Sequence, residues 1–249
     1  MEVPKKEISE RISIAEEKRQ AFLEGKVLLI DKPLNWTSFD VIRKLRGVLQ
    51  IKKIGHAGTL DPLATGLLIV CTGRFTKEIN TYMAARKEYT GTITLGAETP
   101  TYDLESTPFN FSPFEHISPE LLVDTAQRFI GPQLQRPPVY SAIKKNGTAA
   151  YELARRGEDP DLVPRPVDIY TFEITKVNLP EVDFRVLCST GTYIRSLAHD
   201  FGKALGCGGY LSALRRTGIG GFSVDDAQTV EEFIDEIRNG LGEHHASDG

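Results

Sequence analysis

One segment of the sequence combines a carboxylate with the backbone freedom that a ligand site needs. It runs from Gly55 to Gly66 and reads GHAGTLDPLATG. Its three glycines allow the backbone to approach a ligand closely, and Asp61 stands directly before Pro62, which restricts the backbone at that point. An Asp-Pro pair is also typical of a helix N-cap or a turn. On these residues alone, the cap or turn is the better supported interpretation.

Motifs for other chemistries are missing from the sequence. There is no G-x-x-x-x-G-K-[ST] loop and no G-x-S-x-G elbow, and the glycine-rich stretch 206–211 fails the dinucleotide pattern at its last position. The three cysteines are far apart, and Cys71 has no evident base partner. Neither they nor the five histidines have the spacing of a disulfide framework or a metal site. We therefore expect neither a metal nor a nucleotide cofactor.

Predicted elements surround the Asp61 segment on both sides. Before it, residues 27–30 form a short apolar strand, and Thr37 or Ser38 can cap a basic amphipathic helix. That helix carries apolar residues at helical spacing, namely Val41, Ile42, Leu45 and Val48. After it, residues 67–71 predict a second apolar strand that ends at Gly73. Asp61 is thus expected between a helix and a strand.

The remainder of the chain mixes strands and helices without regular βαβ spacing. Strands are predicted at 89–95, 167–174 and 184–188, and helices at 119–129 and 149–156. A last helix starts at a capping box, Thr229 to Glu232, and ends at Asn239-Gly240. The proline-rich stretch 132–147 is expected to be an exposed loop that contacts a partner. Together these features favour an α+β fold with a largely antiparallel sheet.

Length and composition are those of a globular protein. The chain has 249 residues, of which 40% are hydrophobic, and no apolar run approaches the roughly 20 residues of a membrane-spanning helix. Its charged start lacks the apolar stretch of a secretory signal, so we expect a cytoplasmic protein. We predict a peripheral lead-in at 1–24, one domain at 25–240 and a loose tail at 241–249.

The net charge of −4 conceals an uneven distribution. Residues 224–249 contain eight acids and one base, so the remaining residues carry +3. Within them, residues 41–60 hold five bases and no acid, and residues 136–156 hold five bases and one acid. These two stretches could bind a polyanion, although charge runs are more often simply solvated surfaces.

The segment around Asp61 resembles the catalytic-aspartate motif of the TruB family of tRNA pseudouridine synthases. The resemblance runs from Gly25 to about Ala227, through further motifs in the family's order. They are 28–33 with Thr37 and Ser38, 87–89 followed by 95–96, 136–142 with Lys144 and Gly147, 188–197, and 214–216. It implies the pseudouridine synthase fold, an α+β fold whose largely antiparallel mixed sheet is flanked by helices, with an RNA-gripping insertion at 132–157.

The resemblance also implies roles for individual residues. Asp61 becomes the catalytic aspartate, Tyr89 the ring that stacks on the target base, and Arg195 the guanidinium paired with the carboxylate. Substrate-binding positions are His56, Tyr193, Leu214 and Lys32. Apart from the family, other interpretations remain: Tyr89 and Tyr193 as core aromatics, Arg195 in a surface ion pair, His56 as a hydrogen-bonded loop residue and Leu214 as packing.

The implied activity is isomerisation of uridine to pseudouridine at position 55, in the T-loop of tRNA. The reaction involves no redox change and no energy input, which agrees with the expectation of no cofactor and no metal. It requires the base to leave its stack, and a carboxylate that Arg195 keeps ionised despite desolvation. The implied partner of this expected monomer is the T-arm stem-loop. The alternatives are the same chemistry on another RNA hairpin and a tRNA-folding chaperone activity.

Three departures from the family pattern accompany the resemblance. Asn35 stands where the family usually has glycine, and since asparagine tolerates left-handed backbone, the turn should survive. Pro100 replaces a commonly acidic residue in the stretch 99–103, which puts local polar contacts there in doubt. Finally, many bacterial relatives carry a further C-terminal RNA-binding module, which this sequence is expected to lack.

Overall fold

The computed structural model describes residues 18–141, 143–145 and 147–239, which divide into two compact units. The first unit contains the described residues up to Ala84 and those from Thr217 onward, and the second contains Ala85–Arg216. Within the described ranges, no helix is long and apolar enough to cross a membrane. Most of the predicted lead-in and the whole predicted tail lie outside the described residues.

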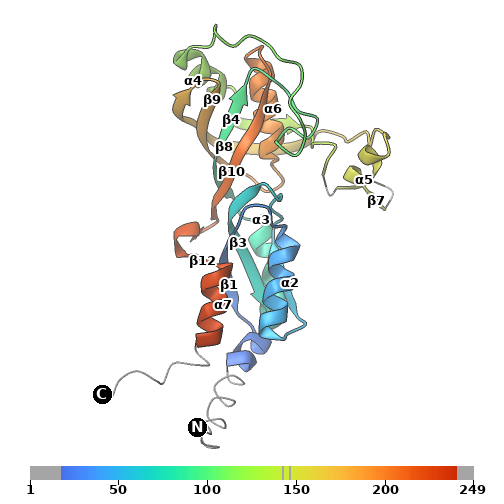
Figure 1. Ribbon diagram of the computed structural model, residues 1–249, viewed down its shortest axis with the longest axis vertical. Coiled ribbons are helices and arrows are strands. Elements are labelled where there is room, and N and C mark those ends of the chain that lie inside the picture. Colours follow the sequence, from blue (N-terminus) through green and yellow to red (C-terminus); the bar gives the residue numbers. More distant parts are fainter. Residues whose placement is uncertain (1–17, 142, 146, 240–249) are drawn as a thin grey trace, which may run out of the picture. The chain divides into compact units, whose positions relative to one another are not determined.

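Paired strands form the centre of the first unit (Figure 1). β1 (Val27–Lys32) pairs antiparallel with β3 (Ala64–Thr72) and parallel with the short β12 (Gln228–Thr229). β2 (Ile54–Ala57) pairs antiparallel with β3, and the end of β10 (Gly209–Ile219) pairs with β11 (Phe222–Ser223). The two apolar runs predicted as strands are confirmed as β1 and β3. Asp61 lies in the connection between β2 and β3.

Two amphipathic helices pack on one face of this sheet, α2 (Ser38–Leu49) and α7 (Val230–Asn239) (Figure 1). Thr37 and Asp40 form a capping box at α2, and Thr229 and Glu232 form another at α7, so both predicted helix starts are confirmed. Residues 18–24 are also helical, and Phe22 packs edge-on against Phe233 at 6.0 Å. This part of the lead-in therefore contributes to the core.

Short helical segments complete the first unit. They are η1 (Gly73–Glu78), α3 (Ile79–Ala84) and η2 (Val224–Asp226). The core they adjoin is made of β-branched and leucine side chains from β1, β3 and α2, many of them fully buried. Because this core holds β1 and β3 in place, the β2–β3 connection that contains Asp61 starts and ends on packed strands.

The second unit is built on strands in the order β10, β4 (Lys87–Leu95), β9 (Glu181–Cys188), β8 (Arg165–Asn178) and β5 (Gly131–Gln135). The ladders β4–β9, β9–β8 and β8–β5 are antiparallel. The α+β class with a largely antiparallel sheet is therefore confirmed.

Helices α4 (Pro119–Gln127) and α6 (Ile194–Ala204) belong to the second unit. The rings of Phe201 (α6) and Phe172 (β8) are in edge-to-face contact with their centroids 5.3 Å apart, and those of Phe172 and Phe184 (β9) are in the same arrangement at 5.8 Å. At Gly202, a Cβ would come within 2.2 Å of the backbone nitrogen of Gly209. Only glycine therefore allows α6 to approach β10 this closely.

The stretch predicted as an exposed loop, 132–147, contains regular structure. Residues 131–135 are the edge strand β5, followed by the hairpin of β6 (Lys144–Lys145) and β7 (Thr148–Ala149) and by α5 (Ala150–Arg155). The loop prediction was wrong for 132–135. Because β5 has β8 as its one neighbour in the sheet order, an edge position accommodates Pro132, which lacks the N–H that a central strand needs.

Candidate active site

The backbone on both sides of Asp61 is held by buried side chains of the same unit. Before it, the Ser38 hydroxyl accepts a hydrogen bond from the N–H of Leu60 at 2.9 Å and donates to the carbonyl of the same residue at 3.3 Å. Ser38 is the first residue of α2 and is 1% exposed. The start of α2 therefore fixes the chain one residue before the carboxylate.

Lys32, at the end of β1, holds the other side. It is 0% exposed, and its Nζ lies 2.8 Å from the carbonyl oxygen of Pro33, 2.5 Å from that of Trp36 and 3.5 Å from that of Pro62. The N–H of Asn35 also donates to the Pro62 carbonyl, at 2.9 Å. An ammonium is costly to bury, and here carbonyl oxygens replace its hydration.

Asp61 itself is partly exposed between these two fixed points. Its carbonyl accepts a hydrogen bond from the N–H of Ala64 at 3.0 Å, which closes a turn before β3. Gly58 and Gly66 have φ values of +88° and +102°, so the glycine freedom expected from the sequence is used on both sides of the turn. Asn35 has a φ of +63°, the left-handed conformation that asparagine was expected to tolerate here.

His56, the other site residue predicted in this unit, lies on β2 opposite Val70 of β3 and is partly buried. Lys32, His56 and Asp61 thus belong to the first unit. Tyr89, Tyr193, Arg195 and Leu214 belong to the second.

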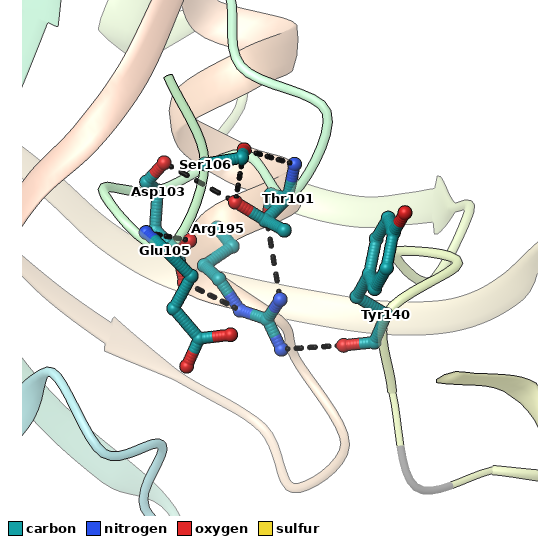
Figure 2. A network of polar contacts seen from close by, with 6 residues as sticks. All are labelled: Thr101, Asp103, Glu105, Ser106, Tyr140 and Arg195. Atoms are coloured by element: carbon teal, nitrogen blue, oxygen red, sulfur yellow. Dashed lines mark hydrogen bonds and ion pairs between the residues drawn. The ribbon is translucent and has the colours of Figure 1, made fainter. Parts of the chain in front are cut away.

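Arg195 forms the centre of a buried polar network in the second unit (Figure 2). Its side chain is 6% exposed, and its terminal nitrogens donate to the carbonyls of Thr101 and Tyr140, each at 3.1 Å. Its Nε lies 3.6 Å from Oδ2 of Asp103, whose side chain is also 6% exposed. A guanidinium in this environment is held in one orientation by a carboxylate and two carbonyls.

The stretch that contains Pro100 retains its polar contacts. The N–H of Thr101 donates to the Ser106 hydroxyl at 3.1 Å, and the Thr101 hydroxyl donates to the carbonyl of Asp103 at 3.2 Å (Figure 2). The N–H of Glu105 donates to Oδ1 of Asp103 at 3.0 Å. Polar contacts among the neighbouring residues are thus present beside Pro100. Sequence reasoning gave Asp103 no role, although its carboxylate faces a predicted site residue.

The predicted tyrosines have different environments. Tyr89 is 9% exposed on β4, opposite Val186 of β9. Tyr193 is the N-cap residue of α6 and is partly exposed, and Leu214 is a partly buried residue of β10. Tyr193 and Arg195 thus stand at the start of one helix.

The start of α6 is bound to the base of the predicted insertion. The side-chain amide of Gln135 accepts from the N–H of Tyr193 at 2.8 Å and donates to its carbonyl at 3.0 Å. The Ser196 hydroxyl donates to the carbonyl of Arg136 at 2.9 Å. These contacts fix β5 to the helix that carries Arg195.

Buried ionisable groups near these elements are shifted toward their neutral forms. Burial, assisted by the nearby charge of Arg216, lowers the pKa of Lys87 to about 8. Burial raises the pKa of Cys188 to about 11, and the same effect raises the pKa of Cys71 to about 11. These two thiols therefore stay protonated at neutral pH and are poor nucleophiles.

Comparison with known families decides the affiliation. A model described as the TruB family pseudouridylate synthase N-terminal domain matches residues 46–194. The chain belongs to the TruB family. A second model, described as the tRNA pseudouridylate synthase B C-terminal domain, matches residues 195–244. The TruB family resemblance that the motifs indicated is thereby confirmed, and with it membership of a family of uridine isomerases.

Curated relatives match almost from end to end. A tRNA pseudouridine synthase B of Flavobacterium johnsoniae is 52% identical over 88% of this chain and 99% of its own length. One of Chloroherpeton thalassium is 46% identical over 90% of this chain and 95% of its own. Both relatives are therefore of nearly the same extent as the matched part of this TruB family chain.

Among solved structures, the chain is similar to one titled as the crystal structure of a Cbf5-Nop10-Gar1 complex, with a TM-score of 0.70 and 29% identity. Another, titled as the structure of an H/ACA RNP bound to a substrate RNA containing 2′-deoxyuridine, has a TM-score of 0.67 and 27% identity. Each match covers 56% of the solved chain, against 88% and 90% of this one. The TruB family fold is thus shared with part of these larger chains.

Proposed function

We propose that this protein isomerises uridine to pseudouridine in tRNA, with the T-loop uridine at position 55 as its target. Family membership and the names of the relatives, tRNA pseudouridine synthase B, support the reaction and the class of RNA. The target position enters the proposal from the resemblance of the motifs. Since tRNA is the proposed substrate, the expected location is the cytoplasm, and the active form is proposed to be a monomer that binds the T-arm.

The observation that carries the proposal is the held position of Asp61. A catalytic carboxylate must be placed accurately while remaining reachable, and Asp61 is partly exposed in a turn whose neighbouring residues are anchored by Ser38 and Lys32. Of the two alternatives from the sequence, the turn is present, whereas a helix-cap role is not, because β3 follows the turn directly. The caps of α2 and α7 are threonines.

The reaction defines what the carboxylate has to do. The bond between C1′ of the ribose and N1 of uracil breaks, the base turns, and C1′ forms a bond to C5. The C5 proton then leaves, and N1 ends protonated, so there is no net change in atoms or electrons. Asp61 can serve by attacking the base, by attacking the sugar or by removing a sugar proton, and each route requires its ionised form.

Other residues enter the proposal in supporting roles. The pairing of Arg195 with Asp61, the stacking of the extruded base on Tyr89 and the nucleotide contacts of His56, Tyr193 and Leu214 come from the resemblance. Stacking on an aromatic ring contributes about 1 to 3 kcal/mol, which offsets much of the cost of unstacking the base. For Lys32, the buried contacts favour a positioning role at the Asp61 turn over direct contact with RNA.

Asp61→Asn tests the assignment with little change in shape. Turnover is measured as tritium released from an unmodified tRNA transcript labelled at uracil C5, and a transcript with cytidine at position 55 shows whether that uridine is the source. We expect turnover below detection, with the dissociation constant for tRNA within about tenfold, or roughly 1.4 kcal/mol. Asp235→Asn, on the exposed side of α7, is the matched control.

Appreciable turnover by Asp61→Asn would remove the catalytic assignment. Release from the transcript with cytidine at position 55, equal to that from the normal transcript, would point to another uridine or hairpin. A tRNA-folding activity that persists in Asp61→Asn would show that the chaperone function is separate from the chemistry.

A further inference from the structure

The first unit has a groove between α2 and α7 that none of the roles above uses. Its volume is about 680 Å³, and it is lined by residues of the two helices and of the turn before α2. These residues are Asn35, Trp36, Asp40, Arg43, Lys44, Gly47, Val48, Ile237 and Arg238. All of them lie within one unit, so the groove belongs to a single packed body.

The charges lining this groove are unbalanced. Arg43, Lys44 and Arg238 contribute three positive charges, and Asp40 contributes the single negative one. Asp40 is already engaged, because it accepts hydrogen bonds from Thr37 and pairs with Arg43 at 2.8 Å. The hydrogen bonds from Thr37 lower the pKa of Asp40, so it stays ionised and occupied. The groove thus presents a net charge of +2 to an incoming ligand.

The apolar residues that line the groove pack against the hydrophobic core of the unit. Trp36, Val48 and Ile237 are partly buried and pack against the core formed by α2, α7 and the sheet. A rigid apolar floor with cations along the rim suits a sugar–phosphate backbone, whose ribose faces are weakly polar and whose phosphates are anionic.

Gly47 supplies an independent indication. It lies in the last turn of α2, three residues before the C-cap Gln50, and glycine is a poorer helix former than alanine by up to about 1 kcal/mol. A Cβ at this position would meet nothing within 4 Å, and the backbone there has no positive φ, so neither packing nor conformation requires glycine. Because Gly47 lines the groove, the absence of a side chain at this position widens the groove.

One residue of the groove lining is hydrogen-bonded to the turn that carries Asp61. Asn35 lines the groove, and its N–H donates to the carbonyl of Pro62, the residue after Asp61, at 2.9 Å. Asn35 therefore links the groove lining to the backbone next to Asp61. Four of the lining residues, Arg43, Lys44, Gly47 and Val48, belong to the basic stretch 41–60.

We propose that the groove between α2 and α7 binds the phosphodiester backbone of the substrate RNA outside the nucleotide that reacts. This inference rests on the proposed function, because it takes an RNA as the ligand. It assigns Arg43, Lys44 and Arg238 to phosphates, and it gives Gly47 the role of leaving room for the strand. An acidic protein and a second copy of this chain are the competing occupants.

A pair of substitutions at Gly47 tests the inference. Gly47→Glu and Gly47→Gln add side chains of the same size, and both replace glycine by a better helix former, so both should fold. They differ in one charge, placed one turn from Arg43 and Lys44. Binding of an unmodified tRNA transcript is measured against salt concentration for both.

We expect Gly47→Glu to bind tRNA about five- to tenfold more weakly than Gly47→Gln at 0.1 M salt. Losing one phosphate contact changes the slope of log K against log salt by about 0.9, which sets that factor. The double variant Lys44→Gln/Arg238→Gln should reduce the slope by nearly two. Lys77→Gln, an exposed lysine of the same unit outside the groove lining, is its control and should leave the slope within measurement error.

Equal binding by Gly47→Glu and Gly47→Gln would overturn the inference. If Gly47→Glu changes self-association but not tRNA binding, the inference is overturned and the groove binds a second copy of the chain. If neither self-association nor tRNA binding changes, the inference is also overturned, and an acidic protein is the remaining occupant. The proposed function fails separately, if the unaltered chain binds tRNA and makes no pseudouridine. In that case the tRNA dissociation constants of the Gly47 variants still test whether the groove binds RNA.

Discussion

The buried pair of Arg195 and Asp103 gives a quantitative prediction for Asp103→Asn. The two side chains are each 6% exposed, with Nε and Oδ2 3.6 Å apart. Asparagine keeps the volume and can still accept the hydrogen bond from the N–H of Glu105. What it removes is a negative charge beside a buried guanidinium, and breaking a buried pair from one side lowers the free energy of unfolding by up to about 3 to 5 kcal/mol.

The same unit contains a control of nearly equal geometry. Arg185 and Glu173 lie 3.5 Å apart, but their side chains are 45% and 53% exposed. Because water screens this pair, Glu173→Gln should lower the free energy of unfolding by less than about 1 kcal/mol. The distances are therefore matched, whereas burial differs, and Arg185 also keeps a second carboxylate partner in Glu88.

Thermal unfolding followed by circular dichroism separates the two cases. For a chain of this size, 1 kcal/mol corresponds to about 2 to 4 °C in Tm, so Asp103→Asn should lower Tm by roughly 6 to 20 °C and Glu173→Gln by at most about 4 °C. Turnover by Asp103→Asn should also fall, because Arg195 loses one of the groups that orient it. Equal Tm losses in the two variants would refute the reasoning from burial.

Two further predictions concern single buried groups. Lys32→Met keeps the length of the side chain and removes its hydrogen-bond donors. Because buried carbonyls are left unsatisfied, the free energy of unfolding should fall by about 2 to 3 kcal/mol. We also expect kcat to fall by more than tRNA binding changes, and normal turnover would contradict the positioning role. Burial lowers the pKa of His199, which is stacked on Tyr102 at 4.0 Å. The unfolded chain then takes up the proton first, so this residue's contribution to stability is lost as the pH falls below about 6.5. His199→Phe keeps a ring in the stack and should show a smaller loss of Tm between pH 7.5 and pH 5.5 than the unaltered chain, and equal losses would refute this assignment.

Elements with strong local signals could be predicted from the sequence. α2 and α7 have capping boxes and apolar stripes, and β1 and β3 are short apolar runs, so each element was placed correctly to within a few residues. The left-handed turn at Asn35 followed from the chemistry of that side chain. In all of these, the residues that determine the structure are close neighbours in the chain.

Other elements depend on contacts that a single sequence does not display. α6 begins at Tyr193 without a side-chain cap and contains Gly202, which is present because of a close approach to β10 rather than for helix formation. β10 has no regular alternation and was not predicted.

The candidate site shows the same division. The resemblance led to Asp61 and Arg195, whereas Asp103 was missed because it lies in a turn-rich segment, 92 positions before its partner in the sequence. The Arg–Asp pair is visible only after the strands and α6 of the second unit have been assembled.

The two anchors of the Asp61 turn have a consequence for how variants are interpreted. Ser38 and Lys32 contact the backbone of Leu60 and Pro62, not their side chains. Replacements at position 62 that keep the carbonyl in place are thus compatible with these two contacts, whereas changes at 32 or 38 are expected to displace the Asp61 carboxylate. A mutational screen restricted to residues near the RNA would overlook both anchors, and a natural variant at either would be mistaken for a folding defect unless kcat and stability were measured separately.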